Sequence, residues 1–88
     1  MNSFVITGRV IDVNDEEIIV DDTNHVYVNE TGDTVPERYT VELWRGLAEQ
    51  ASELKDGDLI AVRGQIRNNH KGLHLIAEKI AFIGGQNA

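Results

Sequence analysis

The chain has 88 residues, of which 41% are hydrophobic and 26% are charged, with one proline and no cysteine. This length fits a single small domain over residues 1–88, whose folding buries about 65% of the surface of the unfolded chain. The lack of cysteine excludes disulfides, a thiol nucleophile and cysteine-ligated zinc. No apolar run approaches the ~20 residues of a membrane span, and the first residues do not form a secretion signal. We therefore expect a cytoplasmic protein with no membrane partner.

The formal net charge of −7 is unevenly distributed along the chain. Residues 1–37 hold nine of the 15 acidic residues but only one of the eight basic residues. The segment from Leu59 to Lys71, by contrast, carries three basic residues and no acidic one. The negative total opposes nonspecific binding to nucleic acid, yet it permits one basic face, because salt screens exposed charges that lie more than ~8 Å apart.

The first part of the chain alternates short β-branched segments with polar turns. The segment Phe4–Val13 is predicted to be a strand that bends or bulges at Gly8. Glu17–Val20 predicts a second strand, and the polar run Asp21–Asn24 predicts a break before a weak strand at His25–Val28.

A longer strand is predicted after the turn-rich segment Asn29–Pro36. Residues 37–44 alternate strictly, so Tyr39, Val41 and Leu43 share one face and are expected in the core. The opposite face is expected to be exposed, and it carries Arg38, Thr40, Glu42 and Trp44.

The hydrophobic period then changes to that of a helix, over Leu47–Leu54. Alternation returns in Leu59–Arg67, and a polar hairpin turn leads to a final strand at Leu73–Ile83. The alternation of this last strand slips near Ala77–Lys79, as a β-bulge would cause. Residues 83–88 are predicted to form a flexible tail.

Five strands with one short helix before the fourth strand predict an all-β protein, namely a five-stranded OB-fold barrel with Greek-key connections. Closing the sheet into a barrel leaves few free strand edges, which suits so short a chain. An SH3-like barrel is the alternative, but such barrels normally lack the intervening helix.

One block of the sequence resembles a known family. The run from Val41 to Gly57, VELWRGLAEQASELKDG, resembles the bacterial single-stranded DNA-binding proteins, in which an aromatic residue ends the third strand and a similar helix follows. The segment Leu59–Ile66 continues the resemblance with VRGQI, and Asn2–Arg9 is similar to the first strand of the family. Gly72–Ile80 is more similar to the PriB primosomal proteins. The resemblance implies an OB fold that binds single-stranded DNA in replication, recombination or repair.

The resemblance also assigns roles to particular positions. The base-stacking aromatic residue before the helix corresponds to Trp44, whereas the aromatic residue six positions earlier corresponds to Arg38. The family's long hairpin between strands four and five carries another aromatic residue, and here a short hairpin has only His70. The resemblance implies a homo-oligomer, a dimer or tetramer. The acidic tail by which the family recruits replication proteins is not seen in this sequence.

Residue chemistry alone also favours nucleic-acid binding. An exposed indole beside arginines stacks unpaired bases, at ~1–3 kcal/mol per base, although Trp44 would instead be structural if it packed under the helix or in a subunit interface. Basic residues on one strand and its turn can follow a phosphate backbone, or can simply be a solvated face. Tyr27 fits either the core or the surface. The predicted nucleic-acid-binding residues are Trp44, Arg38, Thr40, Arg45, Arg63, Arg67, His70 and Lys71.

No pattern in the sequence predicts catalysis, a metal site or a cofactor. Asp12–Glu16 is weakly similar to a calcium loop, but it lacks the glycine and glutamate that such loops require. The alternative function, from a different class, is an OB-fold protein-interaction module with weak or no DNA binding. The acidic first part of the chain, Arg38 in place of an aromatic residue, and Glu42 on the proposed face all favour this alternative.

Overall fold

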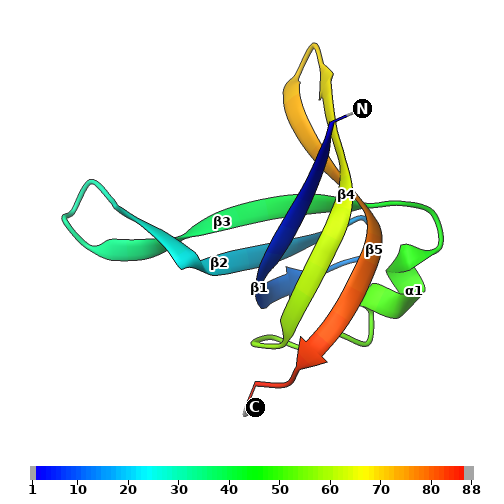
Figure 1. Cartoon of the computed structure of the whole chain (residues 1–88), viewed down its shortest axis with the longest axis horizontal. Helices are drawn as coiled ribbons and strands as arrows, with labels where there is room; N and C mark the ends of the chain where they lie inside the picture. The colour runs from blue at the N-terminus through cyan, green and yellow to red at the C-terminus, as the bar shows by residue number, and fades with distance from the viewer. Residues whose placement is uncertain (1, 87–88) are drawn as a thin grey trace.

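A computed structural model describes residues 2–86 as five strands and one short helix (Figure 1). In chain order these are β1 (Ser3–Val13), β2 (Glu17–Val28), β3 (Thr34–Leu43), α1 (Leu47–Ala51), β4 (Leu59–Asn69) and β5 (Gly72–Gly84). The strands close into a barrel in the order β1-β2-β3-β5-β4, with β3 and β5 parallel and every other pair antiparallel. The predicted OB-fold barrel is confirmed. Over the described residues, no helix is long and apolar enough to cross a membrane.

The interior of the barrel is filled by one cluster of apolar side chains, supplied by alternate residues of the strands and by the helix. Tyr39 and Leu43 pack against this cluster, as the alternation of their strand predicted. Its buried members are Ile6, Val10, Ile18, Val20, Val41, Ala51, Ile60, Val62, Ala77 and Ile80.

Strand β1 is shared between two neighbours. It pairs with β4 from Ser3 to Arg9 and with β2 from Arg9 to Val13. The change of partner occurs next to Gly8, where an added Cβ would lie 2.2 Å from the carbonyl oxygen of Asp21, so a side chain has no room there. The register shift itself lies after Val10 rather than at Gly8.

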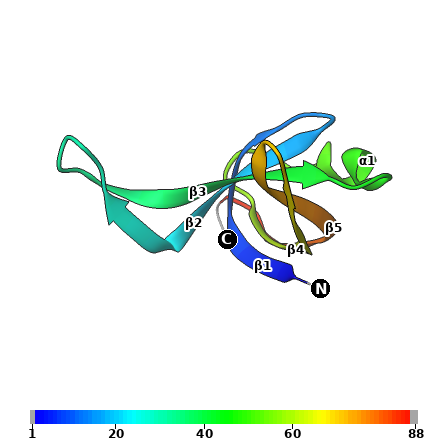
Figure 2. The same ribbon diagram turned by 90° about the horizontal axis from the view of Figure 1, so that it is seen from above.

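Strands β2 and β3 form a long hairpin whose outer part projects from the barrel as an arm (Figures 1 and 2). The predicted break at residues 21–24 is wrong, because β2 continues through it and pairs with β3 on both sides. The irregularity is a bulge: Asp22 faces Glu37 and Val26 faces Pro36, so residues 23–25 have no direct partners on β3. Strand β3 accordingly starts at Thr34, earlier than predicted, and ends at Leu43 rather than at Trp44.

The predicted helix is present but ends at Ala51 instead of Leu54. The Ser52 hydroxyl donates to the Glu49 carbonyl at 2.6 Å, the kind of local hydrogen bond by which serine competes with helix continuation.

The predicted bulge in the final strand is confirmed. Arg63 faces Lys79 and the next residue, Gly64, faces Ala77, so Glu78 has no residue directly opposite it on β4. Strand β5 runs to Gly84, so residues 83 and 84 belong to the strand and not to the predicted tail. Residues 87–88 of that tail lie outside the described residues.

Candidate nucleic-acid interface

Trp44 lies immediately after β3, in the connection to α1. Its backbone N–H donates to the carbonyl of Ala77 on β5 at 3.1 Å, which holds the residue at the rim of the barrel. Trp44 is 46% exposed, and it lines a shallow hollow together with Glu42, Leu43, Arg45 and Ile76. The indole is therefore open to a ligand, with the exposed Arg45 beside it in sequence.

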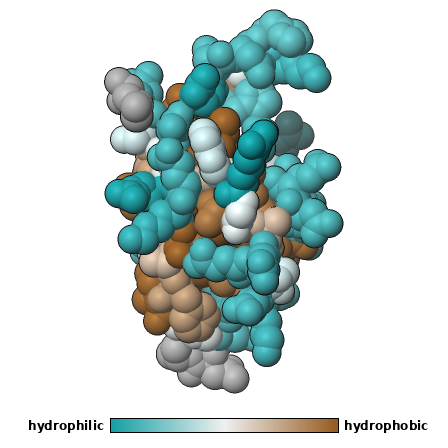
Figure 3. Space-filling view, turned by 90° about the vertical axis from the view of Figure 1, so that its right-hand side faces the viewer, coloured by the Kyte–Doolittle hydropathy of each residue, from teal (hydrophilic) through white to brown (hydrophobic). Residues whose placement is uncertain are grey.

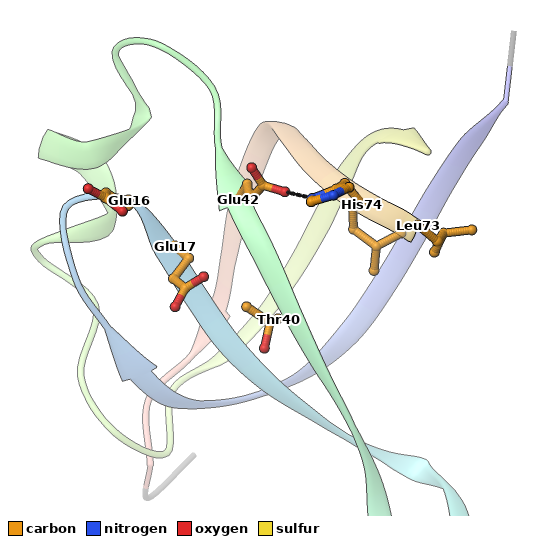
Figure 4. A pocket seen from close by; sticks show the side chains of 7 residues that line it. Glu16, Glu17, Thr40, Glu42, Leu73 and His74 are labelled. Carbon is orange, nitrogen blue, oxygen red and sulfur yellow. Dashed lines mark hydrogen bonds and ion pairs between the residues drawn. The ribbon is translucent and has the colours of Figure 1, made fainter. Parts of the chain in front are cut away.

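The surface next to this hollow is acidic. Thr40 and Glu42 of β3 line a neighbouring pocket with Glu16, Glu17 and His74 (Figure 4). His74 Nδ1 donates to the Glu42 carboxylate at 2.5 Å, and Figure 4 shows this contact from β5 to β3. Three carboxylates around Thr40 repel phosphate, so this part of the predicted face suits bases better than a sugar–phosphate backbone.

Arg38 is bound by a carboxylate on the neighbouring strand. Its Nε and Nη2 donate to the two oxygens of Asp21 at 2.7 and 3.1 Å, and the Asp21 side chain is only 10% exposed. These hydrogen bonds raise the pKa of the Arg38 guanidinium. The charge of Arg38 is therefore offset within the fold, which leaves it less available to a phosphate than the sequence pattern predicted.

The other predicted basic residues lie on the β4–β5 hairpin, which rises at the top of Figure 1. Arg67 faces His74 across the hairpin, and His74 in turn contacts Glu42 of β3. Arg63 instead faces Val5 on β1 and Lys79 on β5. The structure thus separates the predicted site into an aromatic hollow and a basic hairpin, and the exposed members of the hairpin are Arg63, Arg67, His70 and Lys71.

Tyr27, which the sequence left unassigned, is 53% exposed on the β2–β3 arm. It lines a surface depression with Glu37, Arg38 and Tyr39. The arm thus offers a second exposed aromatic ring beside an arginine. Sequence reasoning missed it because the predicted break at residues 21–24 detached Tyr27 from β3.

The bulge of the arm brings three further titratable groups together. His25 Nδ1 donates to Asp22 Oδ2 at 2.8 Å, and this hydrogen bond raises the pKa of His25 and lowers that of Asp22. Glu37 lies opposite Asp22 and accepts a hydrogen bond from the Tyr39 hydroxyl at 2.8 Å, which raises the pKa of Tyr39. No signal in the sequence indicated this group, because Glu37 reaches Asp22 and His25 only through the pairing of β2 with β3.

No family model and no curated protein matches this sequence. Among solved structures, the fold is similar to that of the second single-stranded DNA-binding protein, SSBb, of Mycobacterium smegmatis. The TM-score is 0.67 at 20% sequence identity, and the match covers 92% of this chain and 87% of that chain. The chain thus has an OB-type barrel of the kind found in that DNA-binding protein.

Proposed function

We propose that this protein binds single-stranded DNA and acts in replication, recombination or repair, without catalysis or a cofactor. The observation that carries the proposal is the exposed indole of Trp44, which lines an open hollow with Arg45. The likeness of the barrel to a solved single-stranded DNA-binding protein supports it.

In the proposed mode, bases stack on Trp44 while the phosphates contact basic side chains outside the acidic zone. The three glutamates near Thr40 direct the backbone away from β3. Arg67, which faces His74 across the β4–β5 hairpin, and Lys71 in the turn of that hairpin carry the phosphate contacts together with Arg63. Tyr27 on the arm serves as a further stacking platform. Stacking on exposed rings has little sequence preference, because every base has a π-face.

We further propose that the protein assembles as a homo-oligomer in the cytoplasm. Residues Ser3–Gly8 of β1 pair with β4 on one side, while pairing with β2 begins only at Arg9. Within residues 2–86, the other edge of this half-strand therefore has no partner strand and could pair with a second copy. Val5 is 71% exposed on this half-strand. Hydrophobic side chains also gather in the lower part of the face shown in Figure 3.

Titration of the protein with oligo-dT, followed by intrinsic tryptophan fluorescence, tests the proposal directly. Trp44 is the only tryptophan in the sequence, so the signal reports on this residue. Stacking should change the emission, and the apparent affinity should fall when the salt concentration is raised. An emission that oligo-dT leaves unchanged at low salt would contradict the proposal.

A second candidate function, a protein-interaction module, is favoured by the acidic pocket around Thr40 and by the neutralised Arg38. It predicts a weak response to oligo-dT or none, and it predicts instead that Trp44→Ala weakens binding to a protein partner or self-association. The two candidates therefore separate in the same titration.

A further inference from the structure

The bulge at the base of the β2–β3 arm places two carboxylates directly opposite each other. Asp22 of β2 faces Glu37 of β3 in the register, and the Asp22 side chain is only 12% exposed. Like charges in directly opposed positions of a sheet destabilise it unless a cation lies between them. This position in the fold therefore calls for a positive group.

His25 supplies the third group, because the bulge turns it back toward this pair. Bulges commonly redirect a side chain in this way. One ligand atom from each of Asp22, His25 and Glu37 lies within 4.8 Å of the other two, and His25 Nδ1 is 2.8 Å from Asp22 Oδ2. Ligand atoms of a tetrahedral zinc ion lie about 3.3 Å apart, given metal–ligand distances near 2.0–2.1 Å, so small side-chain movements would bring all three into range.

Groups around the cluster already orient two of its members. The backbone N–H of Asn24 donates to Asp22 Oδ1 at 3.0 Å, which leaves Oδ2 directed at His25. The hydroxyl of Tyr39, a residue packed against the core, donates to Glu37 Oε2 at 2.8 Å. Such outer contacts are what hold carboxylate ligands in place in metal sites.

We propose that Asp22, His25 and Glu37 bind a divalent transition-metal ion of the zinc class. One imidazole with two carboxylates suits such a borderline ion, whereas Mg²⁺ and Ca²⁺ prefer oxygen ligands throughout. The His25 side chain is 70% exposed, so water has access to the remaining coordination position. The ion would tie β2 to β3 across the bulge and fix the arm that carries Tyr27. The proposal does not depend on the DNA-binding function.

The test is calorimetric titration of Zn²⁺ into the full chain after treatment with a chelator. We expect one ion per chain, and about tenfold or greater loss of affinity in His25→Gln and in Glu37→Gln. The control is His74→Gln, which removes a histidine that also contacts a glutamate but belongs to no three-ligand group among the described residues. Mg²⁺ should bind much more weakly than Zn²⁺.

Thermal melting of each metal-free variant shows whether it folds, and Zn²⁺ should raise the melting temperature of the unmodified chain but not that of His25→Gln. Tyr39→Phe, which keeps the ring in the core and removes only the donor to Glu37, should weaken Zn²⁺ binding with little effect on metal-free stability. Equal affinity for Zn²⁺ in His25→Gln and the unmodified chain would overturn the proposal. So would a loss of affinity in His74→Gln alone.

Discussion

The guanidinium of Arg38 forms a bidentate pair of hydrogen bonds with the Asp21 carboxylate, and these bonds join β3 to β2 at the base of the projecting arm. The resemblance to bacterial single-stranded DNA-binding proteins places a base-stacking aromatic residue at position 38. In this chain position 38 instead holds an arginine, which neutralises the nearly buried carboxylate of Asp21. Arg38 therefore has a structural partner, and in the proposed function Trp44 and Tyr27 are the aromatic residues that would stack bases.

The first prediction concerns this pair. Arg38→Gln should lower the melting temperature, because it leaves the Asp21 carboxylate without its charged partner in a site with little solvent. It should reduce affinity for oligo-dT less than Arg67→Gln does. The matched control is Arg63→Gln, whose side chain is exposed between Val5 and Lys79 and whose loss should barely change the melting temperature. A larger loss of DNA affinity in Arg38→Gln than in Arg67→Gln would show that Arg38 contacts phosphate after all.

The second prediction concerns the basic hairpin. If Arg63, Arg67 and Lys71 each neutralise one phosphate, a log–log plot of affinity against salt concentration should have a slope of about −2, at ~0.7 per contact on single strands. Replacing one of the three with glutamine should reduce the slope by ~0.7. The measurement is a series of oligo-dT titrations at several salt concentrations. A slope that none of the three substitutions changes would identify these residues as a solvated face.

The third prediction concerns the close approach of β4 to β5 at Gly64, next to the bulge in their pairing. A Cβ at Gly64 would lie 1.8 Å from the carbonyl oxygen of Ile76, and backbone atoms cannot move aside as a flexible side chain can. Gly64→Ala should therefore cost at least ~1–3 kcal/mol of the free energy of unfolding, the usual range for overpacking. Gly85→Ala is the control, since no heavy atom of the described residues, apart from its two chain neighbours, lies within 4 Å of its added Cβ. This variant should change stability by less than ~0.5 kcal/mol. Equal stabilities of the two variants in urea unfolding would contradict this close approach.

The sequence predicted those features that depend on local pattern. Strict alternation placed Tyr39 and Leu43 against the core, and its slip near Ala77 located the bulge of β5. The apolar spacing located the helix correctly but predicted an end that is too late. The helix ends at Ala51, where the Ser52 hydroxyl donates a hydrogen bond to the backbone carbonyl of Glu49.

The features that the sequence did not predict arise from pairing across strands. A polar run such as residues 21–24 is typical of a turn, but here the ladder with β3 continues on both sides of it and the extra residues form a bulge. The Arg38–Asp21 bond and the Asp22–His25–Glu37 group follow from that register. No local pattern could indicate them, since only the β2–β3 pairing brings Arg38 to Asp21 and Glu37 to Asp22.

The fourth prediction concerns pH. The hydrogen bond to Asp22 raises the pKa of His25 above its ordinary value of 6.5, so its stabilisation is complete below that pH and is lost as pH rises through the raised pKa. The same bond lowers the pKa of Asp22 below 3.8, so its share is present above that pH and is lost on acidification. His25→Gln should therefore destabilise the protein more at about pH 5.5 than at about pH 8.5, measured by urea unfolding with a chelator present. A destabilisation that is equal at the two pH values would show that the pair does not form in solution.

The central claim is that Trp44 stacks an unpaired base, and the affinity of Trp44→Ala for oligo-dT tests it most directly. Loss of one stacked base at ~1–3 kcal/mol predicts binding weaker by about 5- to 150-fold. Because Trp44 is 46% exposed, the melting temperature should change little, whereas truncation of a buried tryptophan would cost ~3–5 kcal/mol of stability. Weakened binding with an unchanged melting temperature is the result we predict. Unchanged affinity with a collapsed melting temperature would contradict it and would favour the protein-interaction function.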